Sequence, residues 1–373
     1  MIPVMRPWFG PEEQAAVGEV IASGWVAQGP RVAEFERAYA ASVQAGHGVA
    51  ASSCTTALHL ALVLAGVGPG DEVVVPSLSF IATANVVRYA GATPVFADID
   101  PATGNLTAKT IDAARTARTR AVIIVHQGGV PADVDDIRAA HDDVALIEDA
   151  ACAAGSTYRD RPVGAGANIA AWSFHPRKLL TTGEGGMITT DDPEWAARAR
   201  RLREHGMSVS AADRHASGST APEEYTEVGY NYRMTDLQAA VGLVQLRRLP
   251  ELIARRRALA ARYQELLAGI PGLTTAGDTE YGTTNYQSFW IALPADFPMS
   301  RNELLTFLAE RGVSARRGIM AAHLEPAYAG VPAAELPHTE WLTGNSLILP
   351  LFHAMTEAEQ DQVAAAVLAA AGA

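Results

Sequence analysis

Short apolar segments alternate with helix-like segments between residues 47 and 190. Phe80, His126 and Asp149 lie near the ends of runs that are rich in Val and Ile. These runs are EVVVP at 72–76, TPVFAD at 93–98, AVIIVH at 121–126 and VALIEDA at 144–150. Such alternation predicts an α/β fold on a mostly parallel sheet. Ligands of such sheets bind at the carboxyl ends of the strands, so the residues there are the first candidates for a site.

Capping signals mark two helices after residue 190. Asp192 is the expected N-cap of a helix that begins with proline and that Gly206 closes. Thr235 and Gln238 form a capping box for a second helix. Pro250 is expected to interrupt or end that helix, because proline lacks the amide that continues the ladder.

The pattern beyond residue 250 predicts a second, smaller domain. A strand-like run occupies 286–293, and amphipathic helices are expected at 301–312 and 356–372. We therefore predict a large domain at 1–250, which includes an N-terminal arm, and a small α+β domain at 251–373.

Composition and charge exclude several classes of protein. The 373 residues carry a formal net charge of -12, so the basic surface that nucleic-acid binding requires is not expected. The basic run at 255–257 is interpreted as a solvated helix face. Cys54 and Cys152 are far apart and form no C-x-x-C motif, which predicts neither disulfides nor a thiolate metal site. With no signal-peptide or membrane-spanning pattern, a soluble cytoplasmic protein is expected.

Lys178 is the strongest candidate for a nucleophile. It stands between an apolar run and a turn that contains Gly183, Gly185 and Gly186. A partly desolvated lysine loses its proton more easily and can form a Schiff base with a carbonyl cofactor, while glycines let the backbone pass close to a ligand. The alternative is an ordinary surface lysine.

Three further features would complete a cofactor site. Asp149 could keep a pyridine nitrogen protonated, although it could also cap a loop. Thr55 and Thr56 lie where a loop enters a helix and are candidates for binding a phosphate; the alternative is simple N-capping by Ser53, Thr55 or Thr56. Phe80 could stack on an aromatic ring or belong to the core. No G-x-G-x-x-G follows a strand and no phosphate loop occurs, which argues against nicotinamide, flavin and nucleotide folds.

Taken together, these segments resemble the DegT/DnrJ/EryC1/StrS family of sugar aminotransferases, which use pyridoxal phosphate and have fold type I. The likeness runs almost from end to end and in that family's order. It rests on SGWVAQGPRVAEFE, SSCTTALHLAL, GPGDEVVVPSLSFIATANV, PVFADIDPATGN, VHQGGVPADVD, IEDAACAAG, SFHPRKLLTTGEGG, GYNYRMTDLQAAVGLVQL and LILPLF. The resemblance implies a large domain with a mostly parallel seven-stranded sheet between helices.

The resemblance also assigns roles to residues. Lys178 would hold the cofactor and carry protons as catalytic base and acid, and Asp149 would face the pyridinium. Phe80 would stack on the ring, and Thr55, Thr56 and Ser173 would contact the phosphate. Asn231 matches an asparagine that reaches the phosphate of a neighbouring subunit, which predicts a homodimer with shared active sites.

Other positions stay open. Cys152 stands where many members of the family have His or Gln, near the expected ring hydroxyl, and is interpreted as a small buried thiol that still belongs to the cofactor site. Arg316, His323 and Tyr328 lie where the small domain would close over the substrate. Trp25 either borders the sugar pocket or anchors the N-terminal arm.

The resemblance implies that L-glutamate gives its amino group to the cofactor, which then passes it to a nucleotide-linked 4-keto or 3-keto deoxysugar. Glutamine as donor and a cyclitol ketone as acceptor stay open. The dehydratase branch of the family has histidine in place of the lysine, so Lys178 argues against it. A regulatory homologue without turnover is the alternative outside enzymes, and the intact set of candidate residues argues against it.

Overall fold

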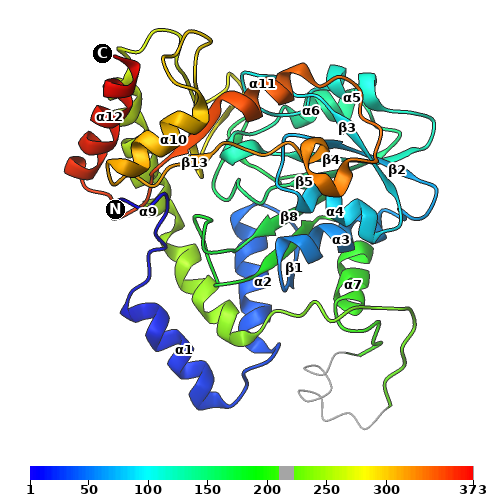
Figure 1. Ribbon diagram of the computed structural model, residues 1–373. Helices are drawn as coiled ribbons and strands as arrows, with labels where there is room; N and C mark the ends of the chain where they lie inside the picture. The colour runs from blue at the N-terminus through cyan, green and yellow to red at the C-terminus, as the bar shows by residue number, and fades with distance from the viewer. Residues whose placement is uncertain (210–221, 373) are drawn as a thin grey trace.

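A seven-stranded sheet with the order β1-β9-β8-β5-β4-β2-β3 lies at the centre of the computed structural model, which describes residues 1–209 and 222–372 (Figure 1). The strands β2, β3, β4, β5 and β8 pair in parallel, and β9 is antiparallel to both β8 and β1. The mostly parallel seven-stranded sheet is therefore confirmed. The strands are β1 (His47–Ala51), β2 (Glu72–Pro76), β3 (Thr93–Ala97), β4 (Thr119–Val125), β5 (Ala145–Asp149), β8 (Ile169–Ser173) and β9 (Gly186–Thr190).

Both faces of this sheet are buried. Along β2, Val74 belongs to one hydrophobic cluster, whereas Val73 and Val75 belong to another on the opposite face. Continuous apolar strands of this kind are typical of parallel sheets covered by helices on both sides. The helices of this part are α1 (Pro11–Ser23), α2 (Pro30–Ser42), α3 (Cys54–Leu64), α4 (Ala82–Tyr89), α5 (Ala108–Ala114), α6 (Val134–Ala140) and α7 (Pro193–Leu202), with the 3-10 turn η1 (Gln127–Gly129).

A second, four-stranded antiparallel sheet has the order β10-β12-β14-β13. Its strands and helices all lie beyond residue 267, as the change in sequence pattern predicts. They are β10 (Thr274–Thr275), β12 (Phe289–Ala292), β13 (Arg316–Arg317), β14 (Ser346–Leu349), α10 (Arg301–Glu310), η2 (Ala322–Leu324), η3 (Pro326–Tyr328), α11 (Pro337–Asn345) and α12 (Glu357–Ala371). Three short strands, β11 (Gly282–Thr283), β6 (Thr157–Tyr158) and β7 (Arg161–Pro162), form a third sheet.

The expected break at Pro250 is wrong, because α9 (Asp236–Leu267) runs through it without interruption. Proline inside a helix costs about 3 kcal/mol through a lost hydrogen bond and a steric clash. Packing of α9 against α1, α2 and α12 offsets that cost (Figure 1). Pro250 itself is exposed. The domain boundary at residue 250 falls inside α9 and stays a prediction.

The basic run at 255–257 is also not a solvated face. Arg256 is buried and donates to the carbonyl oxygens of Tyr286 at 2.7 Å, Gln287 at 2.7 Å and Leu351 at 2.8 Å. A buried guanidinium is tolerated where its donors are satisfied in this way. Arg256 therefore fixes α9 to the loops that lead into and out of the second sheet.

The helix that opens with the Asp192 cap is confirmed, but it ends at Leu202 and not at Gly206. The Asp192 carboxylate accepts from the amides of Glu194 and Trp195. At the other end, the amide of Tyr230 donates to the carbonyl of Leu202 at 2.6 Å. This returning segment, and not a longer helix, satisfies the carbonyl there. Across the described residues, no helix is long and apolar enough to cross a bilayer.

Asp236, the first residue of α9, caps α2 from outside that helix. Its carboxylate accepts from the amides of Gly29 at 2.9 Å, Arg31 at 3.1 Å and Val32 at 2.9 Å. These amides have no acceptor within α2, and a negative charge at a helix N-terminus is favourable. The carboxylate thus joins two helices that are about 200 residues apart in sequence.

We expect Asp236→Asn to lower the free energy of unfolding by about 1–3 kcal/mol. The side-chain NH2 of asparagine would face a backbone N–H of α2, and two donors cannot form a hydrogen bond. Urea denaturation followed by far-ultraviolet circular dichroism measures this. Asp361→Asn, which alters an exposed ion pair with Arg262, is the control and should change stability by less than about 1 kcal/mol. Equal stability of Asp236→Asn and the unmodified protein would show that the cap contributes nothing.

Candidate active site

Four neighbouring strands bring the candidate residues together. In the order β8-β5-β4-β2, the segments at the carboxyl ends contain Lys178, Asp149, Gln127 and Phe80 respectively. Parallel strands place these ends at one edge of the sheet, where open α/β sheets bind ligands. The sequence-based prediction that Phe80, His126 and Asp149 lie near the carboxyl ends of such strands agrees with this arrangement, and Lys178 follows β8.

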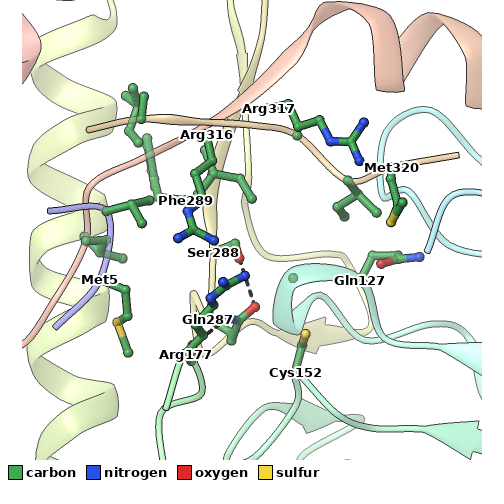
Figure 2. Close-up of a pocket in the computed structure, with 18 of the residues that line it drawn as sticks. Met5, Gln127, Cys152, Arg177, Gln287, Ser288, Phe289, Arg316, Arg317 and Met320 are labelled. Carbon is green, nitrogen blue, oxygen red and sulfur yellow. Dashed lines mark hydrogen bonds between the residues drawn. The ribbon is translucent and has the colours of Figure 1, made fainter. Parts of the chain in front are cut away.

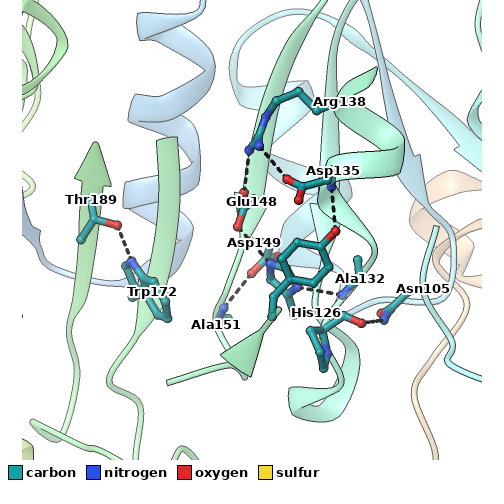
Figure 3. Close-up of polar contacts among 12 residues, drawn as sticks. Asn105, His126, Ala132, Asp135, Arg138, Glu148, Asp149, Ala151, Trp172 and Thr189 are labelled. Carbon is teal, nitrogen blue, oxygen red and sulfur yellow. Dashed lines mark hydrogen bonds and ion pairs between the residues drawn. The ribbon is translucent and has the colours of Figure 1, made fainter. Parts of the chain in front are cut away.

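Asp149 ends β5 as a buried carboxylate with only 5% of its surface exposed (Figure 3). Thr83, in the first turn of α4, donates its hydroxyl to one carboxylate oxygen at 3.0 Å, and the amide of Ala151 donates to the other at 3.2 Å. Burial raises the pKa of Asp149, and these two hydrogen bonds and the nearby Lys178 offset the rise only in part. A cation placed against this carboxylate would lower its pKa again.

Lys178 lies in the loop between β8 and β9. The amide of Phe174 donates to the carbonyl of Gly185 at 2.9 Å and closes the base of this loop. The amide of Lys178 donates to the carbonyl of His175 at 2.8 Å, and Gly183 has a φ of 87°, which favours glycine. The lysine is therefore held in a defined turn and is half-buried, so it is not an ordinary surface lysine.

The Nζ of Lys178 donates to the Sγ of Cys152 at 3.0 Å. Burial alone would lower the pKa of Lys178, but Cys152, Cys54 and Asp149 outweigh it, so the pKa of the ammonium is raised. The expectation that desolvation makes this lysine lose its proton more easily does not hold for the protein by itself. The neighbouring cysteine and aspartate side chains, and not burial, decide the direction in which the pKa of Lys178 shifts.

Cys152 is held in place by the amide side chain of Asn285. The Nδ2 of Asn285 donates to the carbonyl of Cys152 at 2.8 Å and to that of Ala154 at 2.9 Å. Asn285 itself is buried beside Gly129, where a Cβ would lie 1.9 Å from its Oδ1. Glycine is thus required at residue 129, because a side chain there would clash with Asn285. Asn285 in turn holds the loop that places the Cys152 thiol against Lys178.

The loop that enters α3 has the features of an anion site. Ser53 is the N-cap, its Oγ accepts from the amide of Thr56 at 3.2 Å, and the Thr56 hydroxyl completes the capping box. N-capping is therefore confirmed for Ser53, and Thr56 is the third residue of the helix and not its cap. The amides of Cys54 and Thr55 begin the helix and have no acceptor within it. Ser173, the last residue of β8, is half-buried, and its phosphate role stays a prediction.

A cavity of about 720 Å³ lies between the first sheet and the second (Figure 2). Cys152, Gln127 and Phe80 line it on one side, and Arg316 and Phe289 line it on the other. Phe80 is 68% exposed, so it is not a core aromatic. A large apolar ring exposed beside a cavity is free to cover a flat ligand.

His126 belongs to a buried network and not to the cavity (Figure 3). Its Nδ1 accepts from the amide of Ala132 at 3.0 Å, and its Nε2 lies 3.2 Å from Glu148. Arg138 lies 3.6 Å from the other oxygen of Glu148. These contacts fix the loop after β4 and show a structural role for His126.

Some predicted substrate residues lie outside the lining of this cavity. His323 and Tyr328 pack against the β2 side of the first sheet, with His323 Nδ1 2.6 Å from Ser77 Oγ and the Tyr328 hydroxyl donating to Asn85 at 2.7 Å. Their roles toward substrate stay predictions.

Two other candidates lie in segments that come before helices. The indole N–H of Trp25 donates to the carbonyl of Gln28 at 3.0 Å, within the segment between α1 and α2. Asn231 is exposed, and the next residue, Tyr232, accepts from the amide of Ser52 near the start of α3. The segment that contains Asn231 therefore passes the loop that enters α3. The predicted roles of both residues are untested by these contacts.

Several site residues were not predicted from the sequence. Arg177 precedes Lys178 and lines the cavity together with Gln287, Arg301 and Arg317. Gln287, Arg301 and Arg317 belong to the part of the chain beyond α9, and the packing of that part against the first sheet has no local sequence signal. Thr83 was also missed, although its position three residues after Phe80, at the carboxyl end of a strand, was a usable sign.

Comparison with known proteins agrees with this geometry. The family model described as the DegT/DnrJ/EryC1/StrS aminotransferase family matches residues 8–368. The aminotransferase TlmJ from Streptoalloteichus hindustanus is 38% identical, with 99% of this chain and 98% of that chain covered and a TM-score of 0.90. DesI, solved in the presence of its TDP-sugar product, is 35% identical, with 99% and 93% covered and a TM-score of 0.88.

A sugar aminotransferase described as putative, Spr1654 from Streptococcus pneumoniae, has been solved in its PMP-form and its PLP-form. Its PMP-form is 28% identical to this chain, with 100% of this chain and 99% of that chain covered, and has a TM-score of 0.93. The fold type I assignment is thus confirmed along the whole chain. The protein belongs to the DegT/DnrJ/EryC1/StrS aminotransferase family and is a pyridoxal-phosphate-dependent aminotransferase.

Proposed function

We propose that this aminotransferase moves the amino group of L-glutamate to the ketone carbon of a nucleotide-linked 4-keto or 3-keto deoxysugar. The observation that carries the proposal is the cavity of about 720 Å³, which reaches Cys152, the contact of Lys178. Small-molecule sites measure about 300–1,000 Å³, so a sugar nucleotide fits this size class. DesI, which has a TDP-sugar as its product, supports the same substrate class.

The residues present fit pyridoxal phosphate. The Lys178 amine can bind its aldehyde, and the buried Asp149 carboxylate matches a protonated pyridine nitrogen. The exposed face of Phe80 can cover a flat ring, and the free amides at the start of α3 suit a phosphate. The cofactor, when bound, supplies a carbonyl carbon that exchanges amino groups and a ring that withdraws electrons.

Lys178 is proposed as the base and acid of the reaction. With the cofactor and substrate bound, the Nζ of Lys178 would carry a proton between the substrate carbon and the cofactor. The turn from His175 to Lys178 restricts where Nζ can reach. The hydrogen bond from Thr83 favours the ionised form of Asp149, and a pyridinium placed against the carboxylate would oppose the rise in pKa that burial causes.

We further propose a homodimer with shared active sites. Asn231 is exposed and belongs to the segment that passes the start of α3, where the phosphate is proposed to bind. An exposed amide in such a place can reach the phosphate site of a second copy of the chain. Thr55, Thr56 and Ser173 would supply the contacts within one chain.

Transamination predicts a spectral cycle that depends on Lys178. Adding L-glutamate to the protein with bound cofactor should shift the visible absorbance to that of the aminated cofactor, and one keto-sugar nucleotide should restore it. Lys178→Ala should slow both steps by at least about 10²-fold, because the proton-transfer group is lost. Lys109, the only other lysine, provides the control variant Lys109→Ala.

The acceptor panel should include cyclitol ketones as well as 3-keto and 4-keto sugar nucleotides. Restoration by a cyclitol ketone alone would replace the proposed acceptor. If neither glutamate nor glutamine shifts the absorbance, or if Lys178→Ala keeps the full rate, the proposed mechanism is wrong.

Asp149→Asn should stabilise the cofactor-free protein while weakening the cofactor site. Because burial raises the pKa of Asp149, the folded protein keeps this proton to a higher pH than the unfolded chain does. The unmodified protein therefore loses stability as pH rises through the raised pKa, and the Asn variant does not. Thermal unfolding at several pH values should show a Tm advantage for Asp149→Asn near neutral pH that vanishes toward pH 4.

The same variant should bind pyridoxal phosphate more weakly and transaminate at least about 10-fold more slowly, because the pyridinium loses its anionic partner. Asp236→Asn is the matched control, because there the same substitution removes a cap and should lower the Tm. A lower Tm for cofactor-free Asp149→Asn at neutral pH would contradict this prediction.

Cys152→Ala should lower the pKa of Lys178 in the cofactor-free protein, because burial then acts against fewer negative neighbours. Trace acetylation at a series of pH values, followed by mass spectrometry, measures the fraction of reactive amine. The chain contains two lysines, so Lys109 serves as the internal reference. An unchanged or higher half-labelling pH for Lys178 would show that Cys152 does not stabilise the ammonium.

A further inference from the structure

The cavity between the two sheets is strongly cationic. Five arginines line it, and its lining among the described residues contains no Asp or Glu; the arginines are Arg177, Arg256, Arg301, Arg316 and Arg317. A group of cationic side chains with no acidic residue in the lining attracts anionic ligands.

Three of these arginines are already engaged. Arg256 donates to backbone carbonyls, as described above. Arg301 donates to the carbonyl of Thr343 and to Asn302. Arg317 pairs with Glu325 at 3.3 Å. These contacts within the protein leave the three guanidinium groups fewer free donors for a ligand in the cavity.

Arg177 and Arg316 differ from the other three. Within residues 1–209 and 222–372, neither guanidinium has a hydrogen-bond or ion-pair partner that would neutralise it. Figure 2 shows both side chains in the cavity, one from the loop before Lys178 and one from β13, with their guanidinium groups toward each other. Burial, and then the charge of Arg177, lower the pKa of Arg316. Two unpaired like charges that face one cavity are unfavourable until an anion lies between them.

We propose that Arg177 and Arg316 together form a subsite that binds an anionic group of a substrate, of the carboxylate or phosphate class. The guanidinium fork matches the spacing of carboxylate and phosphate oxygens and can bind them through two parallel hydrogen bonds. Arg177 directly precedes Lys178, and Cys152 contacts Lys178 and lines the same cavity. The subsite therefore lies beside the reacting amine and orients the substrate toward it.

The anion has two possible sources, and this inference rests on the proposed function in naming them. One is a carboxylate of the amino donor, and the other is the diphosphate of the sugar nucleotide. Both present the oxygens that the two arginines would bind. The two halves of the reaction use these groups separately, so each half reports on one source.

The test compares Arg177→Met, Arg316→Met and the double variant with the unmodified protein, all with bound cofactor. Stopped-flow absorbance gives the dependence of each half-reaction on L-glutamate and on the keto-sugar nucleotide. Titration calorimetry with glutarate and with thymidine diphosphate measures binding without turnover. Each single substitution should lower the affinity for one of these ligands about 10- to 100-fold, as expected for lost hydrogen bonds to a charged group.

Matched variants separate recognition from general charge and from folding. Arg161→Met removes a charge on the exposed strand β7, outside the cavity lining, and should leave both affinities unchanged. Arg316→Lys keeps the charge but not the fork, so its affinity should fall between those of arginine and methionine. The Tm of the methionine variants should not fall, because no protein partner is lost. In the double variant, the two losses should be less than additive in free energy, because both arginines bind one anion.

Each result of these binding experiments either supports or overturns the proposed subsite. A loss confined to glutamate and glutarate identifies the donor carboxylate, and a loss confined to the sugar nucleotide and thymidine diphosphate identifies the diphosphate. Undiminished binding of all four ligands in the double variant would overturn the subsite while leaving transamination intact. If the unmodified protein shows no transamination, the proposed function fails, and calorimetry with glutarate and thymidine diphosphate still decides whether the arginines bind an anion.

Discussion

The buried carboxylate of Asp149 is the constraint on which most of this site depends. A charge with 5% exposure at the end of a central strand is costly, and burial raises its pKa despite the hydrogen bonds from Thr83 and Ala151. Lys178 lies near enough to oppose that rise, so the two groups influence each other's protonation. A protonated pyridine ring would supply the missing positive charge. The fold therefore holds a group that is poorly satisfied alone and well satisfied by the cofactor of this family.

The sheet and the nearest site residues could be predicted because their signals are local. Continuous runs such as 72–76 and 144–150 identify buried parallel strands, and the carboxyl ends of such strands meet at one edge. Lys178, Asp149 and Phe80 each follow a strand closely, so strand order alone brings them together. The resemblance of the motifs to one family added the cofactor. Capping boxes such as that of Thr235 are equally local and were also predicted correctly.

The remaining features depend on contacts between distant segments. Pro250 was expected to end a helix because propensity favours a break, but tertiary packing of α9 outweighs that preference. Arg256 was expected in solvent because most arginines are there, but the loops at 286–287 and 351 provide the carbonyl acceptors that let it be buried. Arg177 and Arg316 face each other in the cavity only because the second sheet packs over the first (Figure 2). No spacing in the sequence encodes that arrangement.

Two electrostatic features of the site have a common explanation. The carboxylate of Asp149 is buried, which raises its pKa, and the guanidinium groups of Arg177 and Arg316 face one cavity without an anionic partner in the described part of the chain. A ligand group of opposite charge would stabilise each of them. A cofactor with a cationic ring would satisfy the first, and a substrate anion would satisfy the second. A substrate bound in this way would have its anion at Arg177 and Arg316 and its reacting carbon toward Lys178, the residue next to Arg177.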